Sequence, residues 1–448
     1  MNSHRRVLVF VISSTAILLL VSFLTEIFHI KSSSSLNNIN LIADILEKDS
    51  TTLVDTSGNS PGIAIEKKAH EDFLLYRTGH FITDFNTDTT DPSLEGFLQK
   101  LYELKSGKKR KVRIAYFGDS MIEGDLLTQT LRELLQKAFG GDGVGFVPIT
   151  SQVSQFRQTV TDNYSDGWED VNFKSGNSNR LFFSGHLFHT ASASVQMTDQ
   201  TITDSMAIIE KSILCGSVPK PVSITVNNKP VVLHAGKVFN RIPLNNDKNT
   251  GIRVAVANDQ LPVYGISFES ASGVIVDNFS FRGITGIEWG KVDSSFLESI
   301  EESNPYDLIV FQYGVNLLFR PNDKNFSWYA KSMLPVIRKF RNCFKETEFL
   351  LVSTADRAFR YGTQYKSAIG IDSLIKVQAA LAFETNSSFY NLFETMGGAN
   401  SIVDWANRKP SLANKDYVHP NHKGAEVLAH LFFEAIMRDY EKYVQSLK

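Results

Sequence analysis

The sequence has little of what marks several specialised classes of protein. It holds two cysteines in 448 residues, Cys215 and Cys343, and no C-x-x-C spacing, so it offers neither a disulfide framework nor a cysteine-based zinc site. Two isolated buried thiols are expected, with one bridge between them as the alternative. The net charge of −2 lacks the basic excess that nucleic-acid binding requires. We therefore expect no nucleic-acid partner, and we find no sign of a cofactor.

Long hydrophobic runs are missing everywhere except near the N-terminus. Residues Val7 to Thr25 carry no charge, and a helix of about 19 residues can cross the hydrocarbon core of a bilayer. The alternative is a cleaved signal peptide, but the run is long for one. Residues 1–30 are therefore predicted to form a cytoplasmic tip and a transmembrane signal anchor. Arg5 and Arg6 should stay in the cytoplasm. This predicts a single-pass membrane protein in which the chain after Lys31 lies outside the cytoplasmic membrane, in the periplasm or the extracellular space.

The remaining sequence divides by composition and periodicity. Residues 31–90 are rich in Ser, Asn, Thr and Asp and are predicted to be a stalk or linker. Residues 91–150 and 275–448 alternate short apolar runs with amphipathic stretches, which is typical of a parallel sheet covered by helices on both faces. Residues 151–274 instead show period-two alternation between turns, which predicts an inserted antiparallel module resembling a β-sandwich. The expected fold class is α/β, with a β-rich insertion.

A candidate nucleophile lies in the segment Phe117-Gly118-Asp119-Ser120, at the end of the predicted strand 111–117. The run ends at the glycine, and the serine stands where an apolar helical pattern begins. Free N–H groups at a helix N-terminus would stabilise negative charge beside Ser120. A serine in this position is more often a helix N-cap, so the segment does not assign a nucleophile by itself.

A candidate base lies near the C-terminus. Asp416 precedes His419 by three residues, so its carboxylate can reach the imidazole from the same loop and hold one tautomer. The alternative is a surface loop with an incidental histidine. His422 creates a His-x-x-His spacing, but no further ligands are evident, so no metal site is predicted.

Two further segments follow predicted strands, where functional groups gather in open α/β sheets. Gly314 and Asn316 come directly after the apolar run 307–312, and the amide of Asn316 could donate to an oxyanion. Gly286 follows the run 274–281 and could offer its backbone N–H to the same oxyanion. Either segment alone could be an ordinary turn.

Together, the four segments resemble a known family. Gly118-Asp119-Ser120, Gly286, Gly314-x-Asn316 and Asp416-x-x-His419 are similar to blocks I, II, III and V of the SGNH (GDSL-type) hydrolases. The resemblance covers residues 111–148 and 277–448. It implies a three-layer, flavodoxin-like hydrolase domain and a serine esterase without a cofactor. The implied triad is Ser120, Asp416 and His419, the implied oxyanion hole is Ser120, Gly286 and Asn316, and Asp119 and Gly314 support them.

Finer features are similar to the bacterial peptidoglycan O-acetylesterase branch of that family, which also carries a β-rich insertion. They are the run after Ser120 up to Asp125 and the glycine-rich segment 140–146. Many members of that branch have histidine directly after the nucleophile, where this chain has Met121. The G-x-S-x-G motif of the α/β-hydrolases is absent around Ser120.

The resemblance implies an esterase that removes acyl groups, O-acetyl in particular, from a carbohydrate or cell-wall polymer. Two alternatives remain open at the level of sequence. An O-acetyltransferase would use the same triad and deliver the acyl group to a sugar hydroxyl. A non-catalytic glycan-binding protein would act through its β-rich module.

Overall fold

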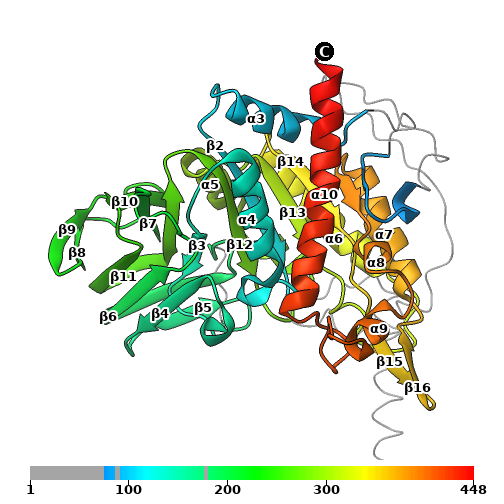
Figure 1. Ribbon diagram of the computed structural model, residues 1–448. Helices are drawn as coiled ribbons and strands as arrows, with labels where there is room; N and C mark the ends of the chain where they lie inside the picture. Colours follow the sequence, from blue (N-terminus) through cyan, green and yellow to red (C-terminus); the bar gives the residue numbers. More distant parts are fainter. Residues whose placement is uncertain (1–74, 86–90, 176–179) are drawn as a thin grey trace, which may run out of the picture. The chain divides into compact units, whose positions relative to one another are not determined.

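The computed structural model describes residues 75–85, 91–175 and 180–448 (Figure 1). The predicted anchor from Val7 to Thr25 and most of the predicted stalk lie outside these residues. Among the helices that the structure describes, none combines the length and the apolar character needed to cross a membrane.

The predicted parallel sheet is present and has six strands in the order β1-β17-β14-β13-β2-β12. All neighbouring pairs are parallel except the edge pair of β1 with β17, which is antiparallel. Its strands are β1 (Ile82–Thr83), β2 (Lys111–Gly118), β12 (Gly273–Ser280), β13 (Leu308–Gln312), β14 (Glu348–Val352) and β17 (Ser388–Tyr390).

Helices cover both faces of this sheet because successive side chains of a strand point to opposite sides. In β2, Ile114 and Tyr116 pack in one apolar cluster, whereas Ala115 and Phe117 pack in the other. The first cluster is covered by α3 (Glu95–Lys105), α4 (Leu126–Phe139) and α10 (His422–Ser446), and the second by α5 (Ser294–Ser303), α6 (Ser327–Cys343) and α7 (Ile371–Glu384) (Figure 1). The short helices α8 (Leu392–Thr395) and α9 (Ser401–Asn407) and the hairpin of β15 (Ala358–Tyr361) with β16 (Gln364–Ser367) complete this part.

The start of α3 differs from the sequence pattern. Asp91 and Pro92 suggest the beginning of a helix, but α3 starts at Glu95 because Leu94 has a left-handed backbone with φ of 61°. The hydroxyl of Ser93 donates to the carbonyl oxygen of Ile82, which fastens this segment to β1 instead.

The predicted β-rich insertion is a sheet of nine strands in the described residues, and every pairing in it is antiparallel. Its strands are β3 (Gly145–Pro148), β4 (Val160–Tyr164), β5 (Glu169–Asn172), β6 (His186–Asp199), β7 (Ile209–Gly216), β8 (Val222–Val226), β9 (Lys229–Leu233), β10 (Phe239–Asp247) and β11 (Gly251–Ser270). We call this sheet the β-module. Hydrogen bonds join it into one sheet because β11 pairs with β6 and β8 in its first half and with β7 and β3 in its second. The sheet thus begins at Gly145, ahead of the expected boundary at 151.

One turn of the β-module follows from its residue types, and the expectation for the two cysteines is confirmed. Asn227 and Asn228 form the turn between β8 and β9 with positive φ angles of 48° and 66°, as a two-residue hairpin of this twist requires. Cys215 and Cys343 are free and buried, with no bridge between them.

Candidate active site

Ser120 lies in a turn just beyond the carboxyl end of β2, an inner strand of the parallel sheet between β13 and the edge strand β12. The strand must end in a glycine here. A Cβ atom on Gly118 would come within 2.8 Å of the Ile122 side chain and 3.2 Å of the Gln312 carbonyl oxygen. The close packing of the turn on β13 therefore sets the position of the serine.

The predicted helix start at Ser120 is wrong. A short 3-10 helix, η2 (Glu123–Asp125), follows the turn, and α4 begins only at Leu126. Gly124 and Asp125 have left-handed backbones with φ of 72° and 68°, which separates Ser120 from α4. The effect of a helix dipole falls off within the first turn of the helix. The structure therefore does not support stabilisation of charge at Ser120 by the dipole of α4.

A short loop before α10 carries His419. The backbone N–H of Asn414 donates to the carbonyl oxygen of His419 at 2.9 Å, which closes the loop. Asn421 caps α10 by accepting a hydrogen bond from the Gly424 N–H at 3.1 Å. The amide of Asn421 also donates to the Ser411 carbonyl oxygen at 2.9 Å. The loop is thus fixed at both of its ends.

The structure brings the predicted nucleophile, base and acid together. Ser120 Oγ lies 2.9 Å from His419 Nε2, and His419 Nδ1 lies 2.7 Å from Asp416 Oδ2. If Nδ1 carries the imidazole proton and donates it to Asp416, Nε2 can accept the proton of the serine hydroxyl. Ser120 and His419 are 299 residues apart in the chain, so this contact exists only in the folded protein.

Asp416 is held as a carboxylate by its own loop. Burial acts to raise its pKa, but the hydrogen bonds from the His419 ring and from the backbone N–H groups of Val418 and His419 outweigh it and bring the pKa below its usual value. A charged Asp416 can then stabilise the imidazolium that forms when His419 takes a proton.

Asp119, the residue before the nucleophile, forms a hydrogen-bonded pair with Asn316. Asp119 is 1% exposed, accepts the Met121 N–H at 2.9 Å and accepts the Asn316 amide at 3.1 Å. Burial raises the pKa of Asp119 to about 7. The same Asn316 nitrogen donates to the Ile284 carbonyl oxygen at 2.9 Å. Both amide protons of Asn316 are therefore engaged, and it can donate to an oxyanion only by sharing or leaving one of these contacts.

Gly286 stands where a side chain would not fit. Its backbone is left-handed, with φ of 94°, and a Cβ atom there would lie 2.7 Å from the Tyr313 ring. Within the described residues, the backbone N–H groups of Ser120 and Gly286 donate no hydrogen bond. Gly314 is equally constrained, because a Cβ atom there would lie 2.3 Å from Thr354 Cβ.

Arg357 is a site residue that the sequence motifs did not reveal. Burial lowers its pKa, and the nearby carboxylates of Asp416 and Asp119 act in the opposite direction. Its Nη1 donates to the Val315 carbonyl oxygen at 2.6 Å, between Gly314 and Asn316. Arg357 follows the carboxyl end of β14, and that place in a parallel sheet is the signal that could have identified it.

A buried ion pair holds the segment after the nucleophile. Arg132 and Asp125 are each 1% exposed, and the two guanidinium nitrogens of Arg132 lie 2.8 and 2.9 Å from the Asp125 carboxylate oxygens. Burial alone would raise the pKa of Asp125, but Arg132 and Arg157 lower it well below its usual value. The pair's stabilisation is therefore present at neutral pH and is lost on strong acidification.

Replacing Asp125 should destabilise the protein. We expect Asp125→Asn to lower the free energy of unfolding by about 3–5 kcal/mol, because it leaves the Arg132 charge buried without a counter-ion. Chemical denaturation at pH 7 measures this. Asp259→Asn, at an exposed carboxylate of β11, is the matched control and should stay within about 0.5 kcal/mol of the parent. Equal stability of the two variants would contradict the role of the ion pair.

Comparison with solved structures supports the fold. A structure of a peptidoglycan O-acetylesterase, captured in action, aligns with 80% of this chain and 99% of its own at 22% identity, with a TM-score of 0.68. A family two carbohydrate esterase from Cellvibrio japonicus aligns with 63% of this chain and 99% of its own at 10% identity, with a TM-score of 0.27. An acetyl xylan esterase aligns with 36% of this chain and 81% of its own at 16% identity, with a TM-score of 0.29. Both superpose too poorly to establish a common fold. No family model and no curated protein matches the sequence.

Proposed function

We propose that this chain, whose resemblance to the SGNH hydrolases is confirmed at the level of the fold, is a serine esterase that removes O-acetyl groups from a carbohydrate polymer. The observation that carries the proposal is the unbroken series of contacts from Ser120 Oγ through the His419 ring to Asp416. That arrangement suits nucleophilic acyl transfer and has no evident use in a protein that only binds glycans.

In the first half of the reaction, His419 Nε2 accepts the hydroxyl proton of Ser120 while Oγ attacks the ester carbonyl carbon. The backbone N–H groups of Ser120 and Gly286 are free to donate to the resulting oxyanion, and Asn316 completes the hole when its amide turns from Asp119. The tetrahedral intermediate then collapses, the bond between the carbonyl carbon and the sugar oxygen breaks, and His419 gives its proton to that oxygen. The sugar leaves with a free hydroxyl, and an acetyl group stays on Ser120.

In the second half, His419 takes a proton from water, and the hydroxide oxygen attacks the acetyl carbonyl carbon. The tetrahedral intermediate collapses, the Ser120–acyl bond breaks, and the proton on His419 passes back to Ser120 Oγ. Acetate leaves and the enzyme is restored.

Two considerations support a polymeric carbohydrate as the substrate. A solved structure with a similar fold is that of a peptidoglycan O-acetylesterase. The predicted anchor at Val7 to Thr25 would place the enzyme outside the cytoplasmic membrane, where cell-wall glycans are found. We include membrane anchoring in the proposal, and a fusion of a topology reporter to the C-terminus tests it.

The decisive experiment follows the acetyl group. Purified full-length protein is incubated with O-acetylated peptidoglycan and, separately, with acetylated xylan, and free acetate is measured over time. Release of acetate from either polymer supports the esterase. Transfer of acetyl to an added unacetylated glycan, without net release of acetate, would instead identify an acetyltransferase. Retention on the glycan with neither reaction would identify a binding protein.

Asn316 should matter for turnover. Loss of one oxyanion donor costs about 3 kcal/mol of transition-state stabilisation, so Asn316→Ala should lower kcat by about a hundredfold. Asn342→Ala, at an exposed position of α6, is the matched control and should leave kcat unchanged. Hydrolysis of an acetyl ester by Asn316→Ala at the parent rate would remove Asn316 from the oxyanion hole.

A further inference from the structure

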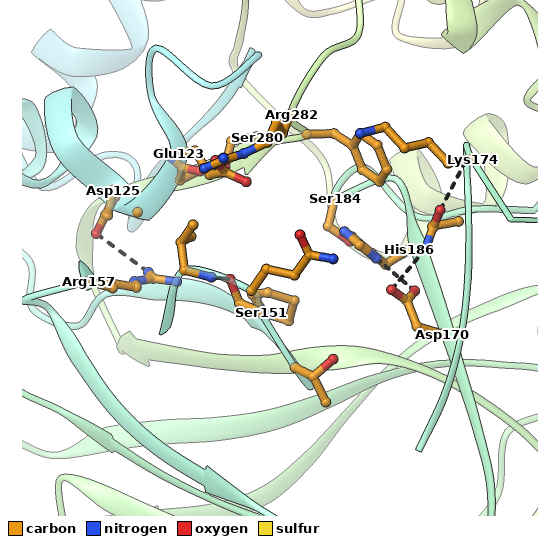
Figure 2. A pocket seen from close by; sticks show the side chains of 18 of the residues that line it. Glu123, Asp125, Ser151, Arg157, Asp170, Lys174, Ser184, His186, Ser280 and Arg282 are labelled. Carbon is orange, nitrogen blue, oxygen red and sulfur yellow. Dashed lines mark hydrogen bonds and ion pairs between the residues drawn. The ribbon is translucent and has the colours of Figure 1, made fainter. Parts of the chain in front are cut away.

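A cavity of about 290 Å³ lies beside the Ser120 turn, between the parallel sheet and the β-module (Figure 2). The sheet side is formed by η2 and by the end of β12, and the module side by the ends of β3, β5 and β6. Neither Ser120 nor His419 lines it. It is nevertheless close to the triad, because Glu123 follows Ser120 by three residues and Ser280 pairs in register with Gly118.

The wall of this cavity is rich in hydroxyl and amide groups. Six of the side chains that supply them are Thr150, Ser151, Gln152, Asn172, Ser184 and Asn278. An apolar ligand would cover such groups without giving them hydrogen-bond partners, which is unfavourable. The wall therefore favours a ligand that both donates and accepts hydrogen bonds.

The charged side chains of the wall already have partners in the protein, so the cavity does not require a counter-ion. Figure 2 shows two of these contacts as dashed lines. The pairs are Arg282 with Glu123, Arg157 with Asp125 and His186 with Asp170, while the ammonium group of Lys174 stands over the Phe281 ring. A neutral polar ligand fits this wall better than an anion or a cation.

Ser184 gives the strongest indication of a ligand. The residue is 3% exposed and lines the cavity, yet its hydroxyl has no hydrogen-bond partner in the described part of the chain. Buried hydroxyl groups are almost always partnered, because an unpartnered one costs stability. The chain holds it firmly in place: Phe182 and Phe183 before it are fully buried in the core, and Gly185 after it packs against Phe281.

We propose that this cavity is a subsite for one neutral sugar unit of the polymer, next to the unit whose ester is cleaved. The proposal rests on the proposed esterase function. The volume is at the lower end of the range of about 300–1,000 Å³ for small-molecule pockets, which suits a single ring. The hydroxyls of a sugar can donate and accept around the ring, and one of them partners Ser184. The β-module thus holds the polymer while the parallel sheet carries the triad.

Binding tests the subsite without turnover. Full-length Ser120→Ala protein is titrated calorimetrically with tetra-N-acetylchitotetraose and with xylotetraose. For the oligosaccharide that binds, adding Ser184→Ala should raise Kd by about fivefold, because the variant removes one hydrogen bond. Adding Gln152→Ala, at an exposed position of the rim, should raise Kd by about threefold for the same reason. Ser205→Ala, in the exposed loop between β6 and β7, is the matched control.

Folding is checked in the same samples. Ser184→Ala should keep or raise the Tm of the parent, because the buried hydroxyl that it removes bonds to nothing in the described protein. Binding of either oligosaccharide that weakens in both cavity variants and not in Ser205→Ala supports the subsite. If neither oligosaccharide binds, or if binding is indifferent to Ser184 and Gln152, the cavity holds water alone and the inference is wrong.

Kinetics separates this inference from the proposed function. With Ser120 restored, kcat/KM is measured for an O-acetylated glycan and for p-nitrophenyl acetate, which is too small to reach both sites. In Ser184→Ala the ratio of the first to the second should fall by about fivefold. A protein that hydrolyses neither ester defeats the proposed function, whereas one that hydrolyses both with an unchanged ratio defeats only the subsite.

Discussion

Ser120→Ala should lower kcat/KM for an acetylated glycan by about 10⁴-fold or more, because it removes the atom that forms the acyl-enzyme. The change should cost little stability. Ser120 is only partly buried, and within residues 75–85, 91–175 and 180–448 its side chain makes a single hydrogen bond, to His419. Acetate release measures the activity, and thermal unfolding checks the fold.

A covalent probe makes the same test independent of the substrate. A fluorophosphonate should add to Ser120 in the parent protein, with a mass shift on the peptide that carries it, and should leave Ser120→Ala unlabelled. Ser327→Ala, at the exposed first position of α6, is the matched control and should be labelled and active like the parent. Persistent activity in Ser120→Ala would assign the chemistry to another nucleophile.

The second large effect is expected at Asp416. Asp416→Asn should lower kcat by about a thousandfold, since an amide can hold the imidazole in the wrong tautomer and cannot balance the charge of the imidazolium. The side chain of Asp416 is 45% exposed, so water can replace part of what the carboxylate does, and the loss should be smaller than at Ser120.

Steady-state kinetics with the small ester distinguishes this role from a structural one. The loss should appear in kcat with little change in KM, because Asp416 acts through His419 and does not contact the substrate. Asp404→Asn, at an exposed carboxylate of α9, is the matched control for removal of one negative charge. A change in KM alone would show that Asp416 only shapes the loop.

The sequence predicts much of the α/β part because each of its elements has a local signal. The runs 111–117 and 308–312 are short, rich in β-branched and aromatic residues and bounded by turns, and both are mostly buried strands of the sheet. The hairpin at Asn227 and Asn228 also follows from local chemistry, since asparagine tolerates the left-handed backbone that such a turn requires. The anchor and most of the stalk lie outside the described residues and stay predictions.

Local signals fail where a distant contact decides the outcome. Leu94 and Asp125 adopt left-handed backbones, so α3 and α4 begin later than the sequence pattern suggests. Beside Leu94, the buried hydroxyl of Ser93 donates to the carbonyl oxygen of Ile82 in β1. The buried carboxylate of Asp125 accepts a hydrogen bond from Thr159, which precedes β4. The long strand β11 appears in the sequence as two separate alternating runs, 252–256 and 263–268. The first run pairs mainly with β6 and the second with β7, so the pairing partner changes partway along one strand.

By itself, the sequence determined the chemical groups of the candidate site: a serine after a buried strand, an aspartate three residues before a histidine, and a glycine and an asparagine after later strands. Only the tertiary structure decided how they meet. It placed Ser120 Oγ at 2.9 Å from His419, turned the amide of Asn316 onto Asp119 across 197 residues, and left Ser184 facing a polar cavity. The physical reason is that a residue type sets which bonds a side chain can make, whereas packing of the sheet, helices and β-module sets which partners come within reach.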